Sequence, residues 1–243
     1  MKKTLAFVFL FLLVLTQLGV HPALAVGNII YVNDDAPGPT FDGTSWTTAY
    51  KRLQNALDAA TPDDQIWVAA GVYYPDEGAT QTNNDPSETF ALGPVGLSVY
   101  GGFNGTETQL GQRDPNANLT ILSGDIDKND TDADSDNIIE ATGDIVGTNS
   151  YHVVTMSLTG NDTTLDGFII TAGKGSYLGL WSDVDARGAG MYINNGTPVL
   201  TNLSFVGNLN GFGGAIYSMN SSPALSNITF TANVGYDSGG GMY

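Results

Sequence analysis

Apolar and polar residues alternate in short stretches of this chain, and the stretches recur. Residues 188–208 read GAGMYINNGTPVLTNLSFVGN and residues 213–233 read GGAIYSMNSSPALSNITFTAN, so equivalent positions lie 25 residues apart. In the first copy, the apolar Leu203 and Phe205 flank the polar Ser204. This period of two predicts strands that turn one face toward a core and the other toward solvent.

The recurrence extends in both directions along the chain. GGGMY at 239–243 begins a third copy, and LDGFIITAG at 165–173 matches LTNLSFVGN at 200–208 with an offset of 35. We expect the ten extra residues to lie within 176–188. A period near 25 made of short strands is typical of a β-solenoid, in which each coil pairs with its neighbours. A β-propeller is disfavoured because its blades need about 40–50 residues.

Stacked coils bring equivalent residues into columns about 4.8 Å apart. We expect Phe205 and Phe230 to share an apolar column inside the stack. The amides of Asn208 and Asn233, at equivalent corners, are expected to form a ladder along the axis.

The first 25 residues have the layout of a secretory signal peptide. Lys2 and Lys3 precede a long apolar run, and Ala23-Leu24-Ala25 is a small-residue cleavage site. The alternative is an uncleaved membrane anchor, but the apolar run is short for a bilayer span. We therefore expect cleavage near Ala25 and no transmembrane segment in the mature chain.

One convincing helix follows, at about 47–60, where TTAYKRLQNALDAA carries an apolar stripe. Ser45 or Thr47 is the candidate N-cap. We expect this helix to cover the open end of a solenoid within an N-terminal cap at 26–94, with coils at 95–243. Because the sequence stops as a coil opens, we expect a truncated C-terminal end whose uncapped edge self-associates.

Three stretches carry a resemblance to a known family. YVNDDAPGPTFDGTSWTTAYKRLQNALDAATPDDQIWVAAGVYYP at 31–75, SVYGGFNGTETQLGQRDPNANLTILSGDID at 98–127 and NSYHVVTM at 149–156 resemble exported bacterial proteins of the pectin-lyase-like superfamily. GGAI, FVGN and FTAN within the repeats are similar to the repeats of polymorphic outer-membrane protein passengers. The resemblance spans 30–243 and implies an all-β, right-handed parallel β-helix. It implies no single reaction, because the superfamily contains lyases, hydrolases, epimerases and surface proteins with no known reaction.

The net charge of the chain limits which classes of partner it can bind. Without Lys2 and Lys3 the chain has six basic and 25 acidic residues, a net charge of −19. Such a protein repels nucleic acid and anionic membranes, which leaves cations, neutral glycans or other proteins as partners. The chain has no cysteine, so its stability depends on burial and backbone hydrogen bonds.

An acidic stretch, GDIDKNDTDADSDN at 124–137, is the candidate metal site, because alternating carboxylates can wrap calcium. An EF-hand reading from Asp125 fails at its sixth position, Asp130, which should be Gly, and at its twelfth, Asp136, which should be Glu. The alternative is a solvated acidic loop. The candidate ligands are Asp125, Asp127, Asn129, Asp132, Asp134 and Asp136.

A second candidate site is DVDAR at 183–187, with Lys174 and Trp181 nearby. Lyase-type elimination on a uronate needs calcium held by carboxylates and a base that removes the C5 proton. Asp183 and Asp185 supply the carboxylates and Arg187 the base. The alternative is an exposed ion pair.

His152 and a set of aromatic residues each allow both a structural and a functional interpretation. His152 lies beside an apolar run, where a hydrogen-bonded strand residue is the expectation rather than a general base. Several aromatic residues stack on sugar rings if they share an exposed face, and form an ordinary stacking column if they do not. These are Tyr73, Tyr74, Trp181, Tyr192 and Tyr217.

These patterns predict an exported protein, secreted or at the cell surface or outer membrane. Its leading function is non-catalytic, adhesin-like binding of glycans or proteins along an elongated face. The alternative is a calcium-dependent polysaccharide lyase or a related carbohydrate-active enzyme. A third reading is a rigid stalk without a ligand.

Overall fold

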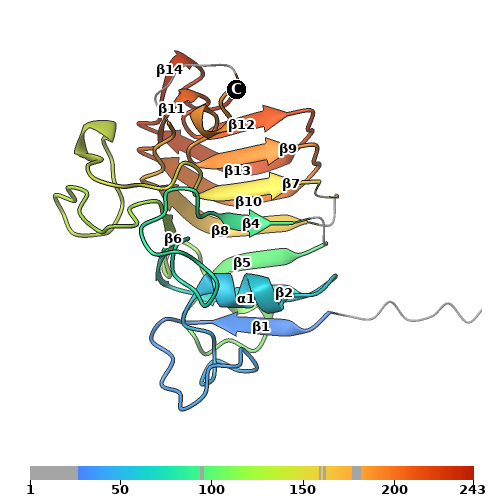
Figure 1. The fold of residues 1–243 in the computed structure, drawn as a ribbon. Helices are drawn as coiled ribbons and strands as arrows, with labels where there is room; N and C mark the ends of the chain where they lie inside the picture. The colour runs from blue at the N-terminus through green and yellow to red at the C-terminus, as the bar shows by residue number, and fades with distance from the viewer. Residues whose placement is uncertain (1–26, 94–95, 159, 161–162, 177–181) are drawn as a thin grey trace, which may run out of the picture.

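The computed structural model describes residues 27–93, 96–158, 160, 163–176 and 182–243 (Figure 1). This part of the chain is mainly β, with one short α-helix, α1 (Leu53–Ala59), and three 3-10 turns, η1 (Leu110–Gln112), η2 (Thr142–Asp144) and η3 (Val184–Ala186). The strands are β1 (Ile29–Val32), β2 (Gln65–Ala69), β3 (Gly71–Tyr73), β4 (Phe90–Leu92), β5 (Ser98–Phe103), β6 (Thr120–Ser123), β7 (Val154–Ser157), β8 (Thr164–Thr171), β9 (Met191–Asn194), β10 (Val199–Val206), β11 (Leu209–Phe212), β12 (Ile216–Met219), β13 (Ala224–Thr231) and β14 (Val234–Ser238).

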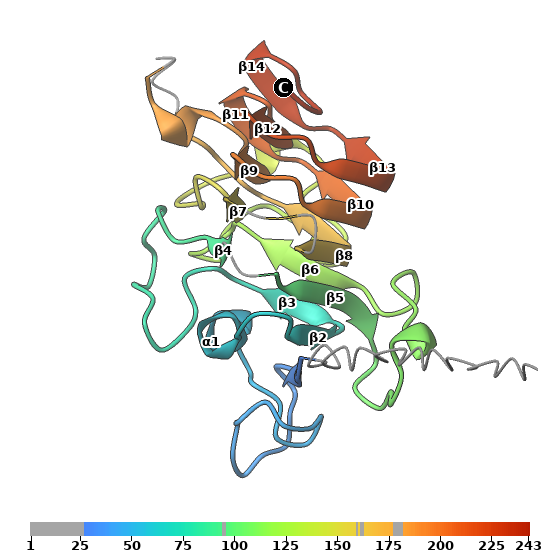
Figure 2. The same cartoon turned by 90° about the vertical axis from the view of Figure 1, so that its right-hand side faces the viewer.

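The strands form three sheets, and within each sheet every pair of neighbouring strands is parallel. The largest follows the order β1-β2-β5-β8-β10-β13, with β3 and β6 attached beside it. The second follows β4-β7-β9-β12, and the third pairs β11 with β14. Figures 1 and 2 show the strands of each sheet stacked along one common direction. This arrangement is compatible with a solenoid-like fold.

The pairing register confirms both repeat offsets. Leu200 of β10 faces Leu225 of β13, 25 residues later, and Leu165 of β8, 35 residues earlier. Tyr192 of β9 faces Tyr217 of β12 at the same offset of 25. Each repeat therefore lies on the next with its equivalent residues in contact.

The core lies between the eight-stranded and the four-stranded sheets. Leu165, Leu200 and Phe205 from the first sheet are fully buried, as are Met191 and Ile216 from the second. The expected column is confirmed by the rings of Phe205 and Phe230, which stack with their centroids 5.6 Å apart. Each fully buried side chain of this size contributes about 1.5–3 kcal/mol to folding.

The predicted asparagine ladder is also confirmed. Asn208 Nδ2 donates to Asn233 Oδ1 at 2.9 Å and to the Ile170 carbonyl at 2.9 Å. Asn208 Oδ1 accepts from the Gly173 backbone N–H at 3.0 Å. The amide thus connects three successive levels of the stack, and it satisfies backbone groups that water cannot reach.

The helix is shorter than the predicted 47–60, and neither Ser45 nor Thr47 is its N-cap. The N-cap is Arg52, which makes no side-chain capping bond. Ser45 instead accepts a hydrogen bond from the Thr48 N–H in the preceding turn. The helix begins only after Tyr50 because that residue pairs with β1, its N–H donating to the Tyr31 carbonyl at 2.9 Å.

The outer edge of β1 is covered by this returning loop rather than by the helix. Tyr31 N–H donates to the Gly43 carbonyl at 2.9 Å, and Asn33 N–H donates to the Tyr50 carbonyl at 2.8 Å. Helix α1 packs Leu53 and Ala56 into the core beside β4 (Figure 2). The loop therefore covers an edge that could otherwise pair with another chain. Among the described helices, none is long and apolar enough to cross a membrane.

Replacing Asn208 by alanine is expected to lower the free energy of unfolding by about 3 kcal/mol, because it leaves buried backbone groups of Ile170 and Gly173 without partners. Urea denaturation followed by circular dichroism measures the change. Asn220→Gly is the control, since Asn220 is exposed and has a positive φ of 49° that glycine tolerates. Equal midpoints for Asn208→Ala and the control would contradict the structural role of the ladder.

Candidate functional site

A groove of about 490 Å³ runs along the outer side of β8, β10 and β13. Its floor includes three outward-facing side chains in one row, Ile169, Ser204 and Thr229, which the parallel register places one above another. Its wall is the loop 104–119 between β5 and β6, which projects from the stack next to β5 in Figure 2. Leu110, Arg113, Pro115, Asn116 and Leu119 of this loop line the groove.

A backbone bend within each long strand supplies the polar side chains of the groove. Gly167, Asn202 and Asn227 occupy equivalent positions in β8, β10 and β13, and all have positive φ values of 88°, 50° and 53°. This left-handed conformation favours glycine and asparagine over other residues. The bend therefore explains why asparagine recurs here, and it places two amides on the rim of the groove.

The amides belong to a hydrogen-bonded chain that ends in an ion pair. Asn227 Nδ2 donates to Asn202 Oδ1 at 2.7 Å, and Asn202 Nδ2 donates to Asp166 Oδ1 at 2.7 Å. Asp166 Oδ2 accepts from Arg113 Nη2 at 2.5 Å. Arg113 also donates to the Gly101 carbonyl at 3.0 Å, so the ion pair fixes the loop against the sheet.

The groove can therefore offer hydrogen bonds to a ligand but little net charge. Arg113 is the one ionisable side chain among the described residues that line it, and Asp166 neutralises it. Acid–base chemistry requires a titratable group within reach of the substrate. Among the described residues that line the groove, Arg113 is the one titratable group, and it is held in an ion pair.

Sequence reasoning did not identify this groove. Its wall has no counterpart in the repeat, and Arg113 and Asp166 are 53 residues apart. The one available signal was the alignment of Gly167 with Asn202 and Asn227, since these residue types share a tolerance for positive φ.

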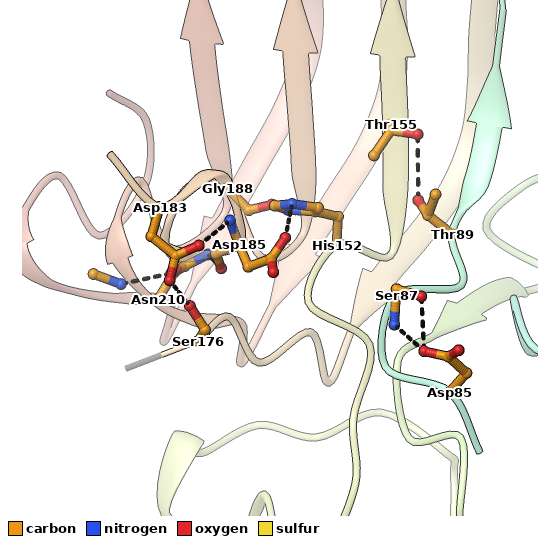
Figure 3. Close-up of polar contacts among 11 residues, drawn as sticks. Asp85, Ser87, Thr89, His152, Thr155, Ser176, Asp183, Asp185, Gly188 and Asn210 are labelled. Atoms are coloured by element: carbon orange, nitrogen blue, oxygen red, sulfur yellow. Dashed lines mark hydrogen bonds and ion pairs between the residues drawn. The ribbon is translucent and has the colours of Figure 1, made fainter. Parts of the chain in front are cut away.

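The structure places the predicted lyase residues elsewhere, on the turn before β9, where Figure 3 shows Asp183 and Asp185. The Asp183 carboxylate accepts hydrogen bonds from the Ser176 hydroxyl and from the Asp185 N–H. The Arg187 guanidinium lies 5.3 Å from the centroid of the Tyr217 ring. The Asp183 carboxylate therefore faces Ser176, the Asp185 carboxylate faces His152, and Arg187 packs on an aromatic ring. Trp181 lies outside the described residues.

His152 lies beside this turn, next to Asp185 and Gly188 (Figure 3). Its Nδ1 is 3.0 Å from the Gly188 carbonyl oxygen, and its Nε2 is 3.8 Å from Asp185 Oδ1. The residue is 8% exposed, and its Nε2 is closed off from solvent. Burial lowers the pKa of His152, opposed by the Gly188 hydrogen bond and by the charges of Asp185 and Asp183. His152 is thus hydrogen-bonded, as expected, but it lies just before β7 and not within a strand.

Two of the candidate aromatic residues, Tyr192 and Tyr217, lie in a stacking column. Tyr192 and Tyr217 are each 6% exposed, and their rings stack 5.9 Å apart. Tyr217 stacks in turn on Tyr243 at 5.4 Å. Tyr73 is buried, and the Tyr74 ring lies under Lys128. Tyr192 and Tyr217 therefore follow the second of the two readings, an ordinary stacking column.

The acidic stretch divides into two groups of side chains. Asp132, Asp134 and Asp136 have carboxylate oxygens within 4.8 Å of one another, and the last two are exposed. Asp132 accepts backbone hydrogen bonds from Ser135 and Asn137, which lower its pKa.

The second group, Asp125, Asp127 and Asp130, is half-buried and lies against residues 146–149. Burial raises the pKa of Asp125, and it raises the pKa of Asp130 to about 6. Asn129, the remaining predicted ligand, is exposed, and its backbone N–H donates to Asp125. The structure thus separates the predicted ligands instead of wrapping them around one centre.

No protein-family model, curated protein or solved structure matches this chain.

Protonation of His152 is expected to make stability fall as the pH is lowered. Its pKa is lower in the folded state than the ordinary value of about 6.5, so the unfolded chain binds the proton more tightly. The stabilisation is present above about pH 6.5 and decreases below it. From about pH 7.5 to 5.5 we expect a loss of about 1 kcal/mol.

His152→Gln is the matched variant for this measurement, because His152 is the sole histidine beyond the predicted signal peptide. Carboxylates such as Asp130 titrate in both proteins and cancel when the two urea-denaturation profiles are subtracted. Parallel pH profiles for the two proteins would show that His152 does not contribute.

Proposed function

We propose that this chain is an exported protein of the cell surface or extracellular space that binds neutral glycans without catalysis. The observation that carries the proposal is the groove beside β8, β10 and β13, with its row of amides and hydroxyls. Export rests on the signal-peptide layout of residues 1–25. The alternative within this proposal is that the same elongated face binds another protein.

We further propose that the three sheets are faces of a right-handed parallel β-helix related to the pectin-lyase-like superfamily. Support comes from parallel register at offsets of 25 and 35 residues and from sheets that the chain visits in turn. Connections between parallel strands are right-handed in about 98% of cases, which favours this hand.

The chemistry of the groove favours an uncharged, repetitive ligand. Asn202, Asn227, Ser204 and Thr229 donate and accept hydrogen bonds without carrying charge, as sugar hydroxyls require. They recur at the strand spacing of about 4.8 Å, so equivalent groups can meet successive units of a polymer. The net charge of −19 beyond the signal peptide repels uronates and other polyanions.

The polysaccharide lyase is less well supported. Elimination needs a base free to reach the substrate, whereas the Arg187 guanidinium lies over Tyr217. Asp183 is occupied by two hydrogen bonds on a turn that lines none of the groove. The rigid-stalk reading gives no reason for the polar groove.

A glycan array followed by isothermal titration tests the binding function. We expect Asn202→Gly, which keeps the bend and removes the amide, to weaken binding of a neutral glycan by about tenfold, or 1.4 kcal/mol. Asn195→Gly is the matched control, because Asn195 also has a positive φ but lies at an exposed turn after β9. Absence of any neutral-glycan binding would reject the proposal, and release of unsaturated uronates with calcium would establish the lyase.

We also propose that the free edge of β13 self-associates. Leu225 and Phe230 continue the buried columns yet are 42% and 39% exposed, and no described strand pairs with this edge. Light scattering should give a mass above that of one chain, and Leu225→Lys should reduce it by placing a charge at the edge. A monodisperse monomer of the unaltered protein would contradict this.

A further inference from the structure

The groove contains a row of amides whose hydrogen bonds run in one fixed direction. The Asp166 carboxylate is 9% exposed and paired with Arg113, so it accepts hydrogen bonds and donates none. Asn202 must therefore turn its NH₂ group toward Asp166, and Nδ2 donates to Asp166 Oδ1 at 2.7 Å. Asn202 Oδ1 then faces Asn227 and accepts from its Nδ2 at 2.7 Å. The ion pair thus sets the orientation of both amides.

This orientation leaves hydrogen-bond donors along the groove. Each of the two amides uses one N–H within the row and keeps a second N–H for which no described group is the acceptor. Asn202 is half-buried, Asn227 is exposed, and both line the groove. The row therefore favours a ligand that brings an acceptor, and a carbonyl oxygen with its two lone pairs is well suited to two such donors.

The wall of the groove presents apolar surface. Leu119 is 39% exposed, and Leu110 and Pro115 of the same loop are half-buried. Ile169 on the floor is half-buried as well. Covering such side chains is favourable only where the ligand is apolar too. A ligand that carries hydroxyl groups alone leaves this part of the groove unused.

Gly167 explains how the loop comes so close to the strands. It occupies in β8 the position that Asn202 and Asn227 occupy in β10 and β13, and a Cβ there would lie 2.6 Å from Arg113 Nη1 and 3.1 Å from Pro115 Cγ. An asparagine at this level would displace the loop. The glycine therefore lets the apolar wall lie against the strands that carry the amides, so that both surfaces belong to one groove.

We propose that the groove selects neutral glycans that contain N-acetylated amino sugars, an inference that rests on the glycan-binding function proposed above. An acetamido group combines a carbonyl oxygen, which accepts hydrogen bonds from amide N–H groups, with a methyl group that requires apolar contact. Asn202 and Asn227 supply the donors, and Leu119 supplies the apolar contact. The group is uncharged, so the net charge of −19 beyond the signal peptide does not oppose its binding.

Isothermal titration of the unaltered protein with chitotetraose and cellotetraose tests the inference. Both oligosaccharides are neutral and share the same backbone and linkage. They differ in one substituent of each sugar ring, which is an acetamido group in chitotetraose and a hydroxyl group in cellotetraose. We expect chitotetraose to bind at least about tenfold more tightly, or 1.4 kcal/mol.

The apolar wall is tested by Leu119→Ala. This substitution removes the contact for the methyl group and should weaken chitotetraose binding about fivefold while leaving cellotetraose binding unchanged. Leu158→Ala is the matched control, because Leu158 is also exposed, at 66%, and lines none of the groove.

The donors are tested by Asn227→Asp, which keeps the shape of the side chain and the tolerance for a positive φ but removes the NH₂ group. It should reduce the preference for chitotetraose about tenfold. Asn195→Asp is the control, since it adds the same charge at an exposed residue with a φ of 54° outside the groove.

Equal affinity for the two oligosaccharides, or tighter binding of cellotetraose, would overturn the preference and leave the neutral-glycan function standing. Binding confined to array glycans without acetamido groups would do the same. An unchanged preference in both Leu119→Ala and Asn227→Asp would place the selecting surface elsewhere and overturn the assignment to this groove. Absence of binding to both oligosaccharides and to every neutral glycan of the array would reject the proposed function, and this inference with it.

Discussion

Parallel pairing between successive repeats is the constraint on which the rest of this structure depends. A strand in the middle of such a stack must match its register to two neighbours at once, so a residue at one repeat position meets its equivalents above and below. Leu200 lies between Leu165 and Leu225 for this reason. The same constraint makes a buried polar residue acceptable only where its neighbour offers a partner. Asn208 satisfies it by bonding to Asn233 and to the backbone of the preceding level.

The outward-facing positions obey the same register, and this gives the surface its regularity. Ile169, Ser204 and Thr229 form a row because the residues beside them must form the core. The bends at Asn202 and Asn227 add a row of amides, since a left-handed residue is needed wherever the long strand turns. A binding surface with the spacing of the strands thus follows from the architecture. A single loop, fixed by the Arg113–Asp166 ion pair, converts that surface into a groove.

The segments that interrupt the repeat carry many of the ionisable side chains. The loop 104–119, the acidic loop after β6 and the turn before β9 carry Arg113, Asp130 and Asp185 respectively. Many of their carboxylates accept hydrogen bonds from backbone N–H groups nearby, so an Asp-rich stretch here is largely the means by which an irregular loop satisfies its own backbone. Asp127 and Asn149 nevertheless each retain a buried oxygen that no described donor reaches.

The sequence by itself determined the long repeat strands β8, β10 and β13, the 25-residue and 35-residue offsets, the Phe205–Phe230 column and the Asn208–Asn233 ladder. These are properties of equivalent positions, and a period in the chain becomes a distance in space once parallel strands pair. It misjudged the helix, because pairing of Tyr50 with β1 overrides local helical preference.

Only the tertiary structure decided which aromatic rings are covered, and it alone brought Asp166 to Arg113 and Asn149 to Asp130. Those contacts join a repeat to an insertion, or one end of a loop to the other. No period relates such residues, so their positions depend on how each loop packs against the stack.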